Sequence, residues 1–383
     1  MKEIKIVIGA NYGDEGKGLM TDYFADSFVS AGRPALVILS NGGAQRGHTV
    51  TTPEGIRHVF HHFGSGTLAG ADSWLPRYYI VNPMIFMNEY EELLKKTKGR
   101  NFRIFMDPEC PVTTPFDMIT NQILESHRGS KRHGSCGIGI WETLLRQGPG
   151  LEKMYDMSDN ELKDHLLGPC REQMRKRLRK AGIEELPPEW KELTEDEGLI
   201  ENYIFDLRQM CGIAELKGGE IMRDYERLIF ENGQGLLLDR SRREYGCHTT
   251  PSNTGLRNPA ELIIENLKGC EAYAECCYVS RTYLTRHGAG PFAEECAKEE
   301  INPGMRDLTN VPNPHQGTIR YGKPDRKSIL RRIREDYDSM RLPAGCRKRM
   351  TVAVTHINEY VSDIAKAGTY LSDGESRKSI YSN

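Results

Sequence analysis

The opening of the chain constrains the fold most, because a short apolar run is followed there by a glycine-rich loop. Residues 5–9 read KIVIG, residues 10–18 read ANYGDEGKG, and apolar side chains then recur at helical spacing in residues 19–28. The pattern predicts a buried strand, a tight loop and a helix in that order. The N–H groups of such a loop and the N-terminus of the helix converge, which favours binding of a polyphosphate.

This loop departs from the usual phosphate-binding signature. Asn11 stands where that signature requires its first glycine, and Gly18 replaces the Ser or Thr that holds magnesium. Lys17 supplies a positive charge, and Asp14 is the candidate metal ligand. The alternative is an ordinary tight turn with a solvated Asp and Lys. The predicted triphosphate site comprises Gly13, Glu15, Gly16, Lys17 and Gly18.

A second apolar run, PALVILS at residues 34–40, ends in another glycine-bearing loop, NGGAQRGHT at residues 41–49. Its glycines permit unusual backbone angles. His48 lies in this loop at the expected carboxyl end of a strand, where open α/β sheets bind ligands. A catalytic role is therefore predicted for His48, and the alternative is a structural histidine.

Further apolar runs are short, β-branched or aromatic, and bounded by turn residues, as buried strands are. They occupy residues 78–83, 103–107, 227–231, 276–284 and 350–357. Strands that each end in a polar loop are typical of parallel α/β organisation. We therefore expect an α/β, P-loop-like nucleotide-binding fold with a central, mostly parallel sheet flanked by helices. One domain is expected over residues 1–383, with the charged stretch from about 148 to 225 as a helical cap.

Composition excludes several functional classes. No run among the 383 residues approaches the roughly 20 apolar residues of a membrane span. The net charge of −2 creates no global field for nucleic acid or an anionic membrane. Ten cysteines without a C-x-x-C pair favour reduced thiols, and the chain opens without a signal-peptide pattern. We expect a soluble cytoplasmic protein, in the host cytoplasm if its source is viral.

Several motifs together carry a resemblance to a known family. In order along the chain, GDEGKG, GG-x-x-x-GHT, FENGQGLLLD, PSNT, TRHGAGP and a late T-x-x-N segment resemble the adenylosuccinate synthetase family. The resemblance covers nearly the whole chain. It implies a homodimeric, Mg²⁺-dependent ligase that uses GTP to join IMP and L-aspartate, built on a central, mostly parallel sheet.

The resemblance also implies roles for the residues of the two loops. Asp14 would remove the purine N1 proton and bind magnesium, and the carbonyl of Gly47 would complete the metal site. His48 would be the acid that favours γ-phosphoryl transfer to the purine O6, with Lys17 along the phosphates and Thr49 in the donor site. Phosphorylation makes chemical sense, because C6 of a 6-oxopurine has a poor leaving group until O6 is phosphorylated.

The family's contacts to the purine nucleotide map onto several segments of this chain. Gln45 and Gln234 would face the nucleotide, while Arg146 fits the arginine that the family sends across the dimer to the 5′-phosphate. Asn253 matches a structural turn beside the second phosphate contact. Apart from the family, GSCG at residues 134–137 would be an ordinary loop. The remaining phosphate contacts would be Ser135, Cys136 and Thr250.

Two further loops match the aspartate and donor-base sites. Thr318 and Arg320, in HQGTIRYGKPD, align with the family's arginine-rich aspartate-binding loop, where several arginines would be expected. Ser372 and Gly374, in YLSDGESRKSI, align with the loop beside the donor base. Loss of the other arginines removes donors to the ribose 2′-hydroxyl, so a deoxyribose becomes acceptable.

Asn358 marks the most informative departure, because it stands where the family has an Asp that reads guanine. An ionised carboxylate accepts two hydrogen bonds from guanine, whereas an amide offers one acceptor and one donor. Asn358 could accept from the 6-amino group of adenine and donate to its N1. The sequence therefore predicts ATP or dATP rather than GTP as phosphate donor. The alternative is an Asn that merely ends a strand.

Together, the departures resemble the short viral branch that joins aspartate to dGMP and makes N6-succino-2-amino-2′-deoxyadenylate for diaminopurine DNA. Asp14 differs from some members of that branch, which carry Ser there. The second hypothesis is therefore the IMP enzyme, with GTP or ATP. A third is a nucleotide-binding regulator without turnover, against which the joint retention of Asp14, Lys17 and His48 argues.

Overall fold

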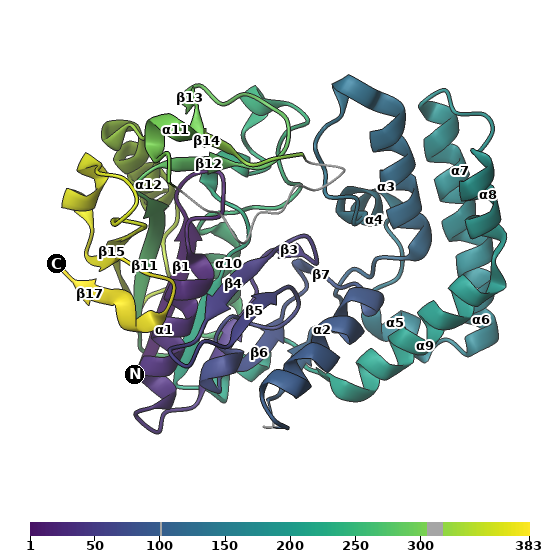
Figure 1. Ribbon diagram of the computed structural model, residues 1–383. Coiled ribbons are helices and arrows are strands. Elements are labelled where there is room, and N and C mark those ends of the chain that lie inside the picture. The colour runs from purple at the N-terminus through teal and green to yellow at the C-terminus, as the bar shows by residue number, and fades with distance from the viewer. Residues whose placement is uncertain (100–101, 305–316) are drawn as a thin grey trace.

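A ten-stranded sheet forms the centre of the computed structural model, which describes residues 1–99, 102–304 and 317–383 (Figure 1). Only the pair β16–β17 is antiparallel, and the other neighbours in the sheet are parallel. The expected α/β class with a mostly parallel sheet is confirmed. In spatial order the strands are β17 (Ile380–Ser382), β16 (Tyr370–Ser372), β15 (Cys346–Thr355), β11 (Ala272–Arg281), β1 (Lys2–Gly9), β10 (Arg227–Glu231), β2 (Ala35–Ile38), β6 (Asp72–Leu75), β8 (Ile104–Met106) and β9 (Glu215–Leu216).

Hydrophobic side chains cover both faces of the sheet, as a parallel sheet between helices requires. In β1, Ile4, Ile6 and Ile8 pack into one cluster, whereas Val7 packs into another with Phe24 of helix α1 (Lys17–Val29). Successive side chains of a strand point to opposite faces, which accounts for this division. Among the described residues, three small sheets lie outside the main one: β3 (Gly42–Gly43) with β7 (Tyr79–Ile80), β4 (His48–Thr51) with β5 (Arg57–Phe60), and β14 (Arg320–Gly322) between β12 (Leu284–Arg286) and β13 (Glu295–Cys296).

Helices flank the sheet, and a group of them lies at the end of the protein opposite β17 (Figure 1). Gly16 precedes α1 with a φ of 96°, a left-handed conformation that glycine adopts without strain and that lets the chain turn sharply into the helix. Helix α3 starts with a capping box between Thr114 and Asp117. Besides α1, the helices outside the segment expected as a cap are α2 (Pro83–Lys96), α3 (Pro115–Arg128), α4 (Ile140–Arg146), α10 (Arg257–Asn266), α11 (Lys298–Ile301) and α12 (Arg326–Ser339). Short 3-10 turns lie at Thr67–Ala69, Gly129–Lys131, Leu236–Leu238, Arg243–Tyr245, Asp363–Ala367 and Arg377–Ser379, and a further one at Gly219–Arg223 lies inside that segment.

The charged stretch at about 148–225 contains a group of helices at one end of the protein (Figure 1). They are α5 (Leu151–Asp156), α6 (Asp159–His165), α7 (Arg171–Lys180), α8 (Pro188–Glu195) and α9 (Glu197–Ile213), with a π-helical turn at Leu166–Cys170. The same stretch also supplies β9, a two-residue edge strand of the main sheet that was not expected. The assignment of all 383 residues to one domain stays a prediction.

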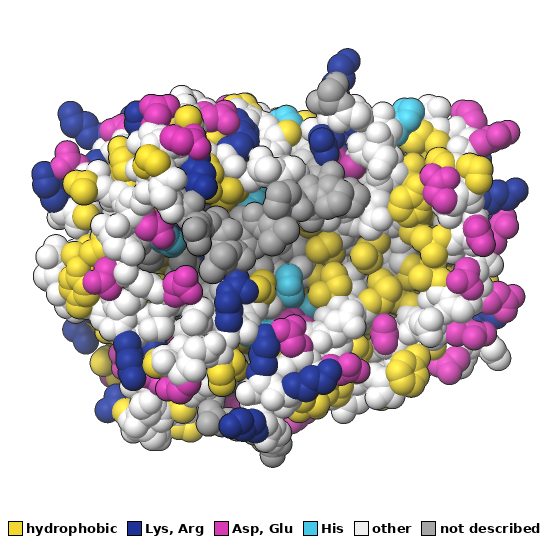
Figure 2. Space-filling model, viewed as in Figure 1, with side chains coloured by type: hydrophobic (Ala, Val, Ile, Leu, Met, Phe, Trp, Pro, Cys, Tyr) yellow, Lys and Arg dark blue, Asp and Glu magenta, His cyan; other side chains and the backbone are white. Residues whose placement is uncertain are grey.

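The surface carries charges of both signs, in agreement with the small net charge. Basic and acidic side chains are interspersed over the face shown in Figure 2. Within the described residues, no helix has the length and apolar character needed to cross a membrane.

Candidate active site

The glycine-rich loops after β1, β2 and β10 meet at one edge of the sheet. These strands are neighbours in the order β1, β10, β2, and the carboxyl ends of parallel strands lie at the same edge. A side-chain carbon added at Gly18 would lie 3.2 Å from Cβ of His48, and one added at Gly235 would lie 2.4 Å from the carbonyl oxygen of Asn11. The loops therefore need glycine at these positions in order to approach one another.

His48 is held by Glu231, a residue that the sequence analysis missed. Nδ1 of His48 lies 2.6 Å from Oε1 of Glu231, whose side chain is fully buried and also accepts hydrogen bonds from the N–H and hydroxyl of Ser65. A carboxylate only accepts, so Nδ1 carries the proton and Nε2 is left to act on a ligand. The signal was present in the sequence: Glu231 ends an apolar run predicted as a strand.

Arg46 is the third member of this group. Its Nη2 lies 2.9 Å from Oε2 of Glu231 and 2.8 Å from Nδ1 of His48, and its side chain is fully buried. Nε and Nη1 of Arg46 have no partner within the described part of the chain. Nδ1 of His48 and the guanidinium of Arg46 are both donors, so they do not bind each other. The Glu231 carboxylate, which accepts from both, holds the two side chains together.

Burial and the charge of Arg46 lower the pKa of His48 to about 4, although Glu231 opposes the shift. The pKa of Glu231 falls to about 2, because Arg46 and His48 outweigh the effect of burial. At neutral pH the resting group is therefore a neutral imidazole, a carboxylate and a guanidinium.

The phosphate loop has its anion-binding donors in place. The Glu15 carboxylate accepts hydrogen bonds from the N–H groups of Asn11 (3.0 Å) and Gly13 (2.8 Å) and pairs with Lys17 Nζ at 2.9 Å. The N–H of Gly13 and Nζ of Lys17, both predicted to bind a triphosphate, thus contact the Glu15 carboxylate, and their binding to a phosphate stays a prediction. The role of Glu15, Gly16 and Gly18 at a triphosphate stays a prediction.

Asp14 lies at the turn of the same loop with a φ of 64°. Its Oδ2 is 2.9 Å from Nη2 of Arg281 and 3.8 Å from Nε2 of His287. Arg281, which ends β11 beside β1, also donates to the hydroxyl of Tyr283 at 2.9 Å. The sequence analysis did not single out either basic residue, although both belong to or follow a predicted strand.

The chemistry of this loop fits Mg²⁺ carried by a triphosphate. Within the described residues, no three His, Cys, Asp or Glu side chains are grouped to hold a metal. Mg²⁺ in nucleotide sites takes one or two carboxylates and completes its shell with phosphate oxygens and water. A single carboxylate at Asp14, together with the exposed Gly47, is compatible with such a site.

The side-chain amides of Gln45 and Gln234 both lie beside Gly42, and their contact with a nucleotide stays a prediction. A side-chain carbon added at Gly42 would lie 3.4 Å from Nε2 of Gln45 and 3.6 Å from Oε1 of Gln234. Both amide oxygens are buried without a partner among the described residues. Buried polar atoms without partners are costly, so a ligand that donates hydrogen bonds would stabilise this arrangement.

Three of the residues expected to contact a phosphate, Ser135, Arg146 and Thr250, have partners within the chain. Ser135 Oγ exchanges hydrogen bonds with Asn121 at 2.8 and 3.2 Å, and burial raises the pKa of Cys136 to about 11, which keeps its thiol protonated. Thr250 donates its backbone N–H to Leu238. The Arg146 side chain is 6% exposed and pairs with Asp117 of its own chain at 3.0 Å. Contact of these residues with a nucleotide phosphate stays a prediction.

A pocket of about 420 Å³ links the phosphate segment to the expected aspartate loop. Gly134, next to Ser135, lines it together with Thr318 and Arg320, and Arg132 adds a second arginine that the sequence analysis missed. Arg320 already pairs with Glu295, with Nε to Oε1 at 2.7 Å. His315 and Gln316, the first two residues of the matching motif, lie outside the described residues. The other lining residues are Gly288, Ala289 and Gly290.

The expected donor-base residues lie on two connected turns. Asn358 is exposed in the turn after β15, and the neighbouring Ile357 donates its N–H to the carbonyl of Ser372 at 3.2 Å. Ser372 Oγ in turn donates to the carbonyl of Gly374 at 3.0 Å. Thr355 Oγ1 donates to the carbonyl of Glu15 at 2.8 Å, which ties these turns to the phosphate loop. Thr49 Oγ1, on β4, is buried without a partner in the described chain.

Comparison with known sequences identifies a single family. The sequence model described as adenylosuccinate synthetase matches residues 6–312. The adenylosuccinate synthetase of Coxiella burnetii (strain CbuG_Q212) is 27% identical over 309 residues, which cover 77% of this chain and 65% of that protein. That of Crocosphaera subtropica is 27% identical over 302 residues, 76% of this chain and 62% of that protein. The chain thus spans slightly less than two thirds of these relatives.

Solved structures that share the fold include the two described next. An adenylosuccinate synthetase from Plasmodium falciparum, described as fully ligated, superposes with a TM-score of 0.70 at 17% identity and covers 99% of each chain. The succinoaminodeoxyadenylate synthetase of cyanophage S-2L, described as bound to dGMP and to dATP as an energy donor, superposes with a TM-score of 0.58 at 12% identity, covering 100% of this chain and 95% of that one.

Proposed function

The chain belongs to the adenylosuccinate synthetase family, and from this premise we propose that it is a C–N ligase joining L-aspartate to C6 of a 6-oxopurine nucleotide. One observation carries the proposal. An imidazole oriented by Glu231, an anion-binding loop with Lys17, and the amides of Gln45 and Gln234 lie on loops that meet at one edge of the sheet. An acid, a phosphate site and partners for a purine edge are the groups that this reaction needs.

The proposed reaction proceeds through a 6-phosphoryl intermediate. Asp14 accepts the N1 proton, O6 attacks the γ-phosphorus, and the nucleoside diphosphate leaves. The aspartate amine then attacks C6, and phosphate leaves with the O6 oxygen. For His48 to act as the acid, its Nε2 must be protonated, and the charges of Glu231 and of an incoming phosphate both favour that form.

We propose Mg²⁺ as the cofactor, held by the Asp14 carboxylate and the Gly47 carbonyl. When bound, it would supply neutralisation of phosphate charge during phosphoryl transfer. Asp14 would then bind the metal in place of Arg281. Its side chain is 23% exposed, so a metal can reach it.

For the acceptor we propose dGMP, with ATP or dATP as donor and N6-succino-2-amino-2′-deoxyadenylate as product. Support comes from Asn358 in place of a carboxylate and from Arg320 as the one retained arginine at its loop. The fold shared with the cyanophage enzyme, whose structure contains dGMP and dATP, agrees with this choice. L-aspartate would bind the pocket that Thr318, Arg320 and Arg132 line.

The second candidate is adenylosuccinate synthetase activity on IMP with GTP or ATP. Two observations favour it: Asp14 is retained, and the Plasmodium enzyme has the higher TM-score of the two structures. A third candidate, a nucleotide-binding regulator without turnover, would have no need of the His48–Glu231 pair. We further propose a homodimer in the cytoplasm, with no nucleic acid or membrane partner.

Phosphate release measured with IMP, GMP and dGMP, each with ATP, dATP and GTP, tests the proposal. We expect aspartate-dependent release that is fastest with dGMP and an adenine triphosphate, and lost in Asp14→Ala and His48→Ala. Turnover of IMP alone would establish the second candidate. Nucleotide binding without release from any acceptor would establish the third.

A further inference from the structure

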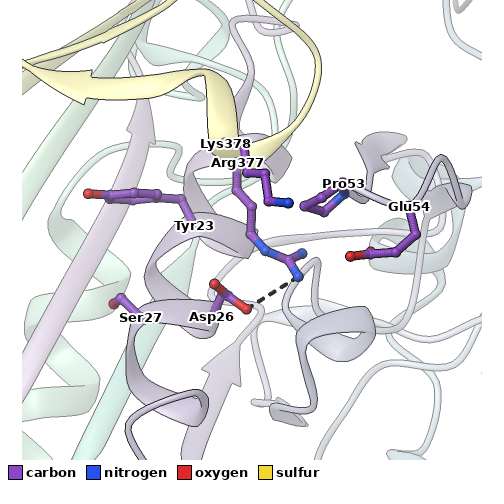
Figure 3. Close-up of a pocket in the computed structure, with 7 residues that line it drawn as sticks. All are labelled: Tyr23, Asp26, Ser27, Pro53, Glu54, Arg377 and Lys378. Carbon is purple, nitrogen blue, oxygen red and sulfur yellow. Dashed lines mark ion pairs between the residues drawn. The ribbon is translucent and has the colours of Figure 1, made fainter.

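A second pocket, of about 290 Å³, lies between helix α1 and the C-terminal hairpin (Figure 3). Its walls come from Tyr23, Asp26 and Ser27 of α1, from Pro53 and Glu54, and from Arg377 and Lys378 of the hairpin. In Figure 3 the side chain of Arg377 extends from the hairpin to α1. None of the residues assigned above to substrate, donor or metal lines this pocket.

Arg377 holds two carboxylates of α1. Its Nη1 lies 2.9 Å from Oδ2 and 3.2 Å from Oδ1 of Asp22, and its Nη2 lies 3.2 Å from Oδ1 of Asp26. Asp22 is fully buried, and the Arg377 side chain is 14% exposed. A charge-assisted pair of this kind fixes both distance and orientation, because a displaced guanidinium would leave a buried carboxylate unpaired.

The two elements that Arg377 joins carry opposite ends of the proposed donor site. Helix α1 begins at Lys17, the residue assigned to the phosphates. The hairpin between β16 and β17 carries Ser372 and Gly374, assigned to the base, and is closed by a 2.9 Å hydrogen bond between the hydroxyls of Ser372 and Ser379. Arg377 lies in this closed hairpin, and its ion pairs therefore link the hairpin to α1, beside the packing of Tyr370 on Tyr23 and Phe24.

We propose that Arg377 is a positioning residue for the donor triphosphate, because its ion pairs with Asp22 and Asp26 fix the hairpin that contacts the base relative to the helix that contacts the phosphates. The inference rests on the proposed function. A nucleotide that binds at two places gains affinity when their separation is set in advance. Loss of Arg377 therefore weakens donor binding and leaves the acceptor site intact.

Arg377→Met is the central variant, and we expect it to fold. Burial already raises the pKa of Asp22 to about 6, so without the guanidinium this carboxyl takes up a proton near neutral pH and avoids a lone buried charge. Arg377→Lys keeps a cation that can reach one carboxylate. Lys378→Met removes the neighbouring, exposed charge of the same pocket and serves as the matched control. Asp26→Asn removes only the outer ion pair and gives a milder second test.

Two measurements on each variant test the inference. Calorimetric titration with ATP, in the absence of acceptor, gives the ATP Kd. Steady-state kinetics give the KM values for ATP and for the acceptor. We expect Arg377→Met to raise the ATP Kd and KM by about tenfold, equivalent to loss of about one hydrogen bond to a charged group, and to change the acceptor KM less than twofold. Arg377→Lys should recover part of the loss, Asp26→Asn should show a smaller rise, and Lys378→Met should match the wild type.

Equal behaviour of Arg377→Met and Lys378→Met would overturn the inference, as would a parallel rise in donor and acceptor KM. If Arg377→Met does not fold, unchanged ATP binding in Asp26→Asn would overturn it instead. A wild-type protein that binds ATP but converts no purine would refute the ligase proposal while the titrations still decide the role of Arg377. A wild type that binds none of ATP, dATP and GTP would overturn both.

Discussion

Nδ1 of His48 lies 2.6 Å from Oε1 of Glu231, and this contact orients the imidazole toward the loops that form the candidate active site. Arg46 binds the other oxygen of the same carboxylate at 2.9 Å. The proposed acid is thus held by a buried carboxylate that is itself fixed by a buried cation. Such supporting groups set the tautomer and direction of a catalytic histidine.

Glu231→Gln should lower kcat by about 10²-fold and change the KM values little, because an amide can present its NH₂ group to Nδ1 and reverse the tautomer. Steady-state kinetics at saturating donor and aspartate measure the effect. Glu244→Gln, at a residue of the exposed turn Arg243–Tyr245, is the control and should match the wild type. A Glu231→Gln enzyme with undiminished kcat would show that His48 is oriented by other groups.

Arg46→Met should destabilise the fold by about 3–5 kcal/mol, because it leaves the buried Glu231 carboxylate with only neutral partners, His48 and Ser65, at neutral pH. Urea unfolding followed by circular dichroism measures the free energy of unfolding. Arg33→Met removes an exposed arginine before β2 and should cost less than about 0.5 kcal/mol. If both variants unfold at the same urea concentration, Arg46 does not compensate the charge of Glu231.

His48 should make stability depend on pH. Its pKa is about 4 in the folded protein, below the ordinary value of 6.5, so the folded state binds fewer protons than the unfolded state between those values. This contribution to the free energy of unfolding is complete above pH 6.5 and is lost as the pH falls toward 4. Asp22 acts oppositely, because its raised pKa of about 6 adds stability as the pH falls.

Comparison of the wild type with His48→Asn isolates the histidine, since both proteins retain Asp22. Urea titrations at pH 6.5 and 4.5 should show that the stability difference between them falls by about 2 kcal/mol, given roughly 1.4 kcal/mol per pKa unit. A constant difference across this range would mean that His48 titrates near its ordinary pKa in the folded protein.

Asn358→Asp should shift the donor preference from ATP toward GTP. A carboxylate can accept from both N1–H and the 2-amino group of guanine, whereas the amide cannot. The ratio of kcat/KM for GTP to that for ATP should rise by about tenfold, the equivalent of about one net hydrogen bond. Asn358 is exposed, so folding should be unaffected. Asn358→Ala is the control, and an equal ratio in all three proteins would place the base elsewhere.

The sequence alone determined the strand–loop–helix order and the strands around it, because local hydrophobic spacing and glycine positions report directly on secondary structure. Residues 5–18 and 34–49 were therefore interpreted correctly as two strands, each ending in a polar glycine loop. The family was also evident from its motifs, since their order along the chain survives where overall identity is 27% or lower.

Only the tertiary structure decided which groups surround these loops. Glu231 and Arg281 come to His48 and Asp14 because β10 and β11 pair with β1 on either side, although more than 180 residues separate each pair of partners along the chain. The pairing of Arg146 with Asp117 likewise could not be predicted from the sequence, because it depends on how α3 and α4 pack. Local pattern encodes what each segment becomes, whereas contacts between charges depend on strand order and helix packing, which are set by burial over the whole chain.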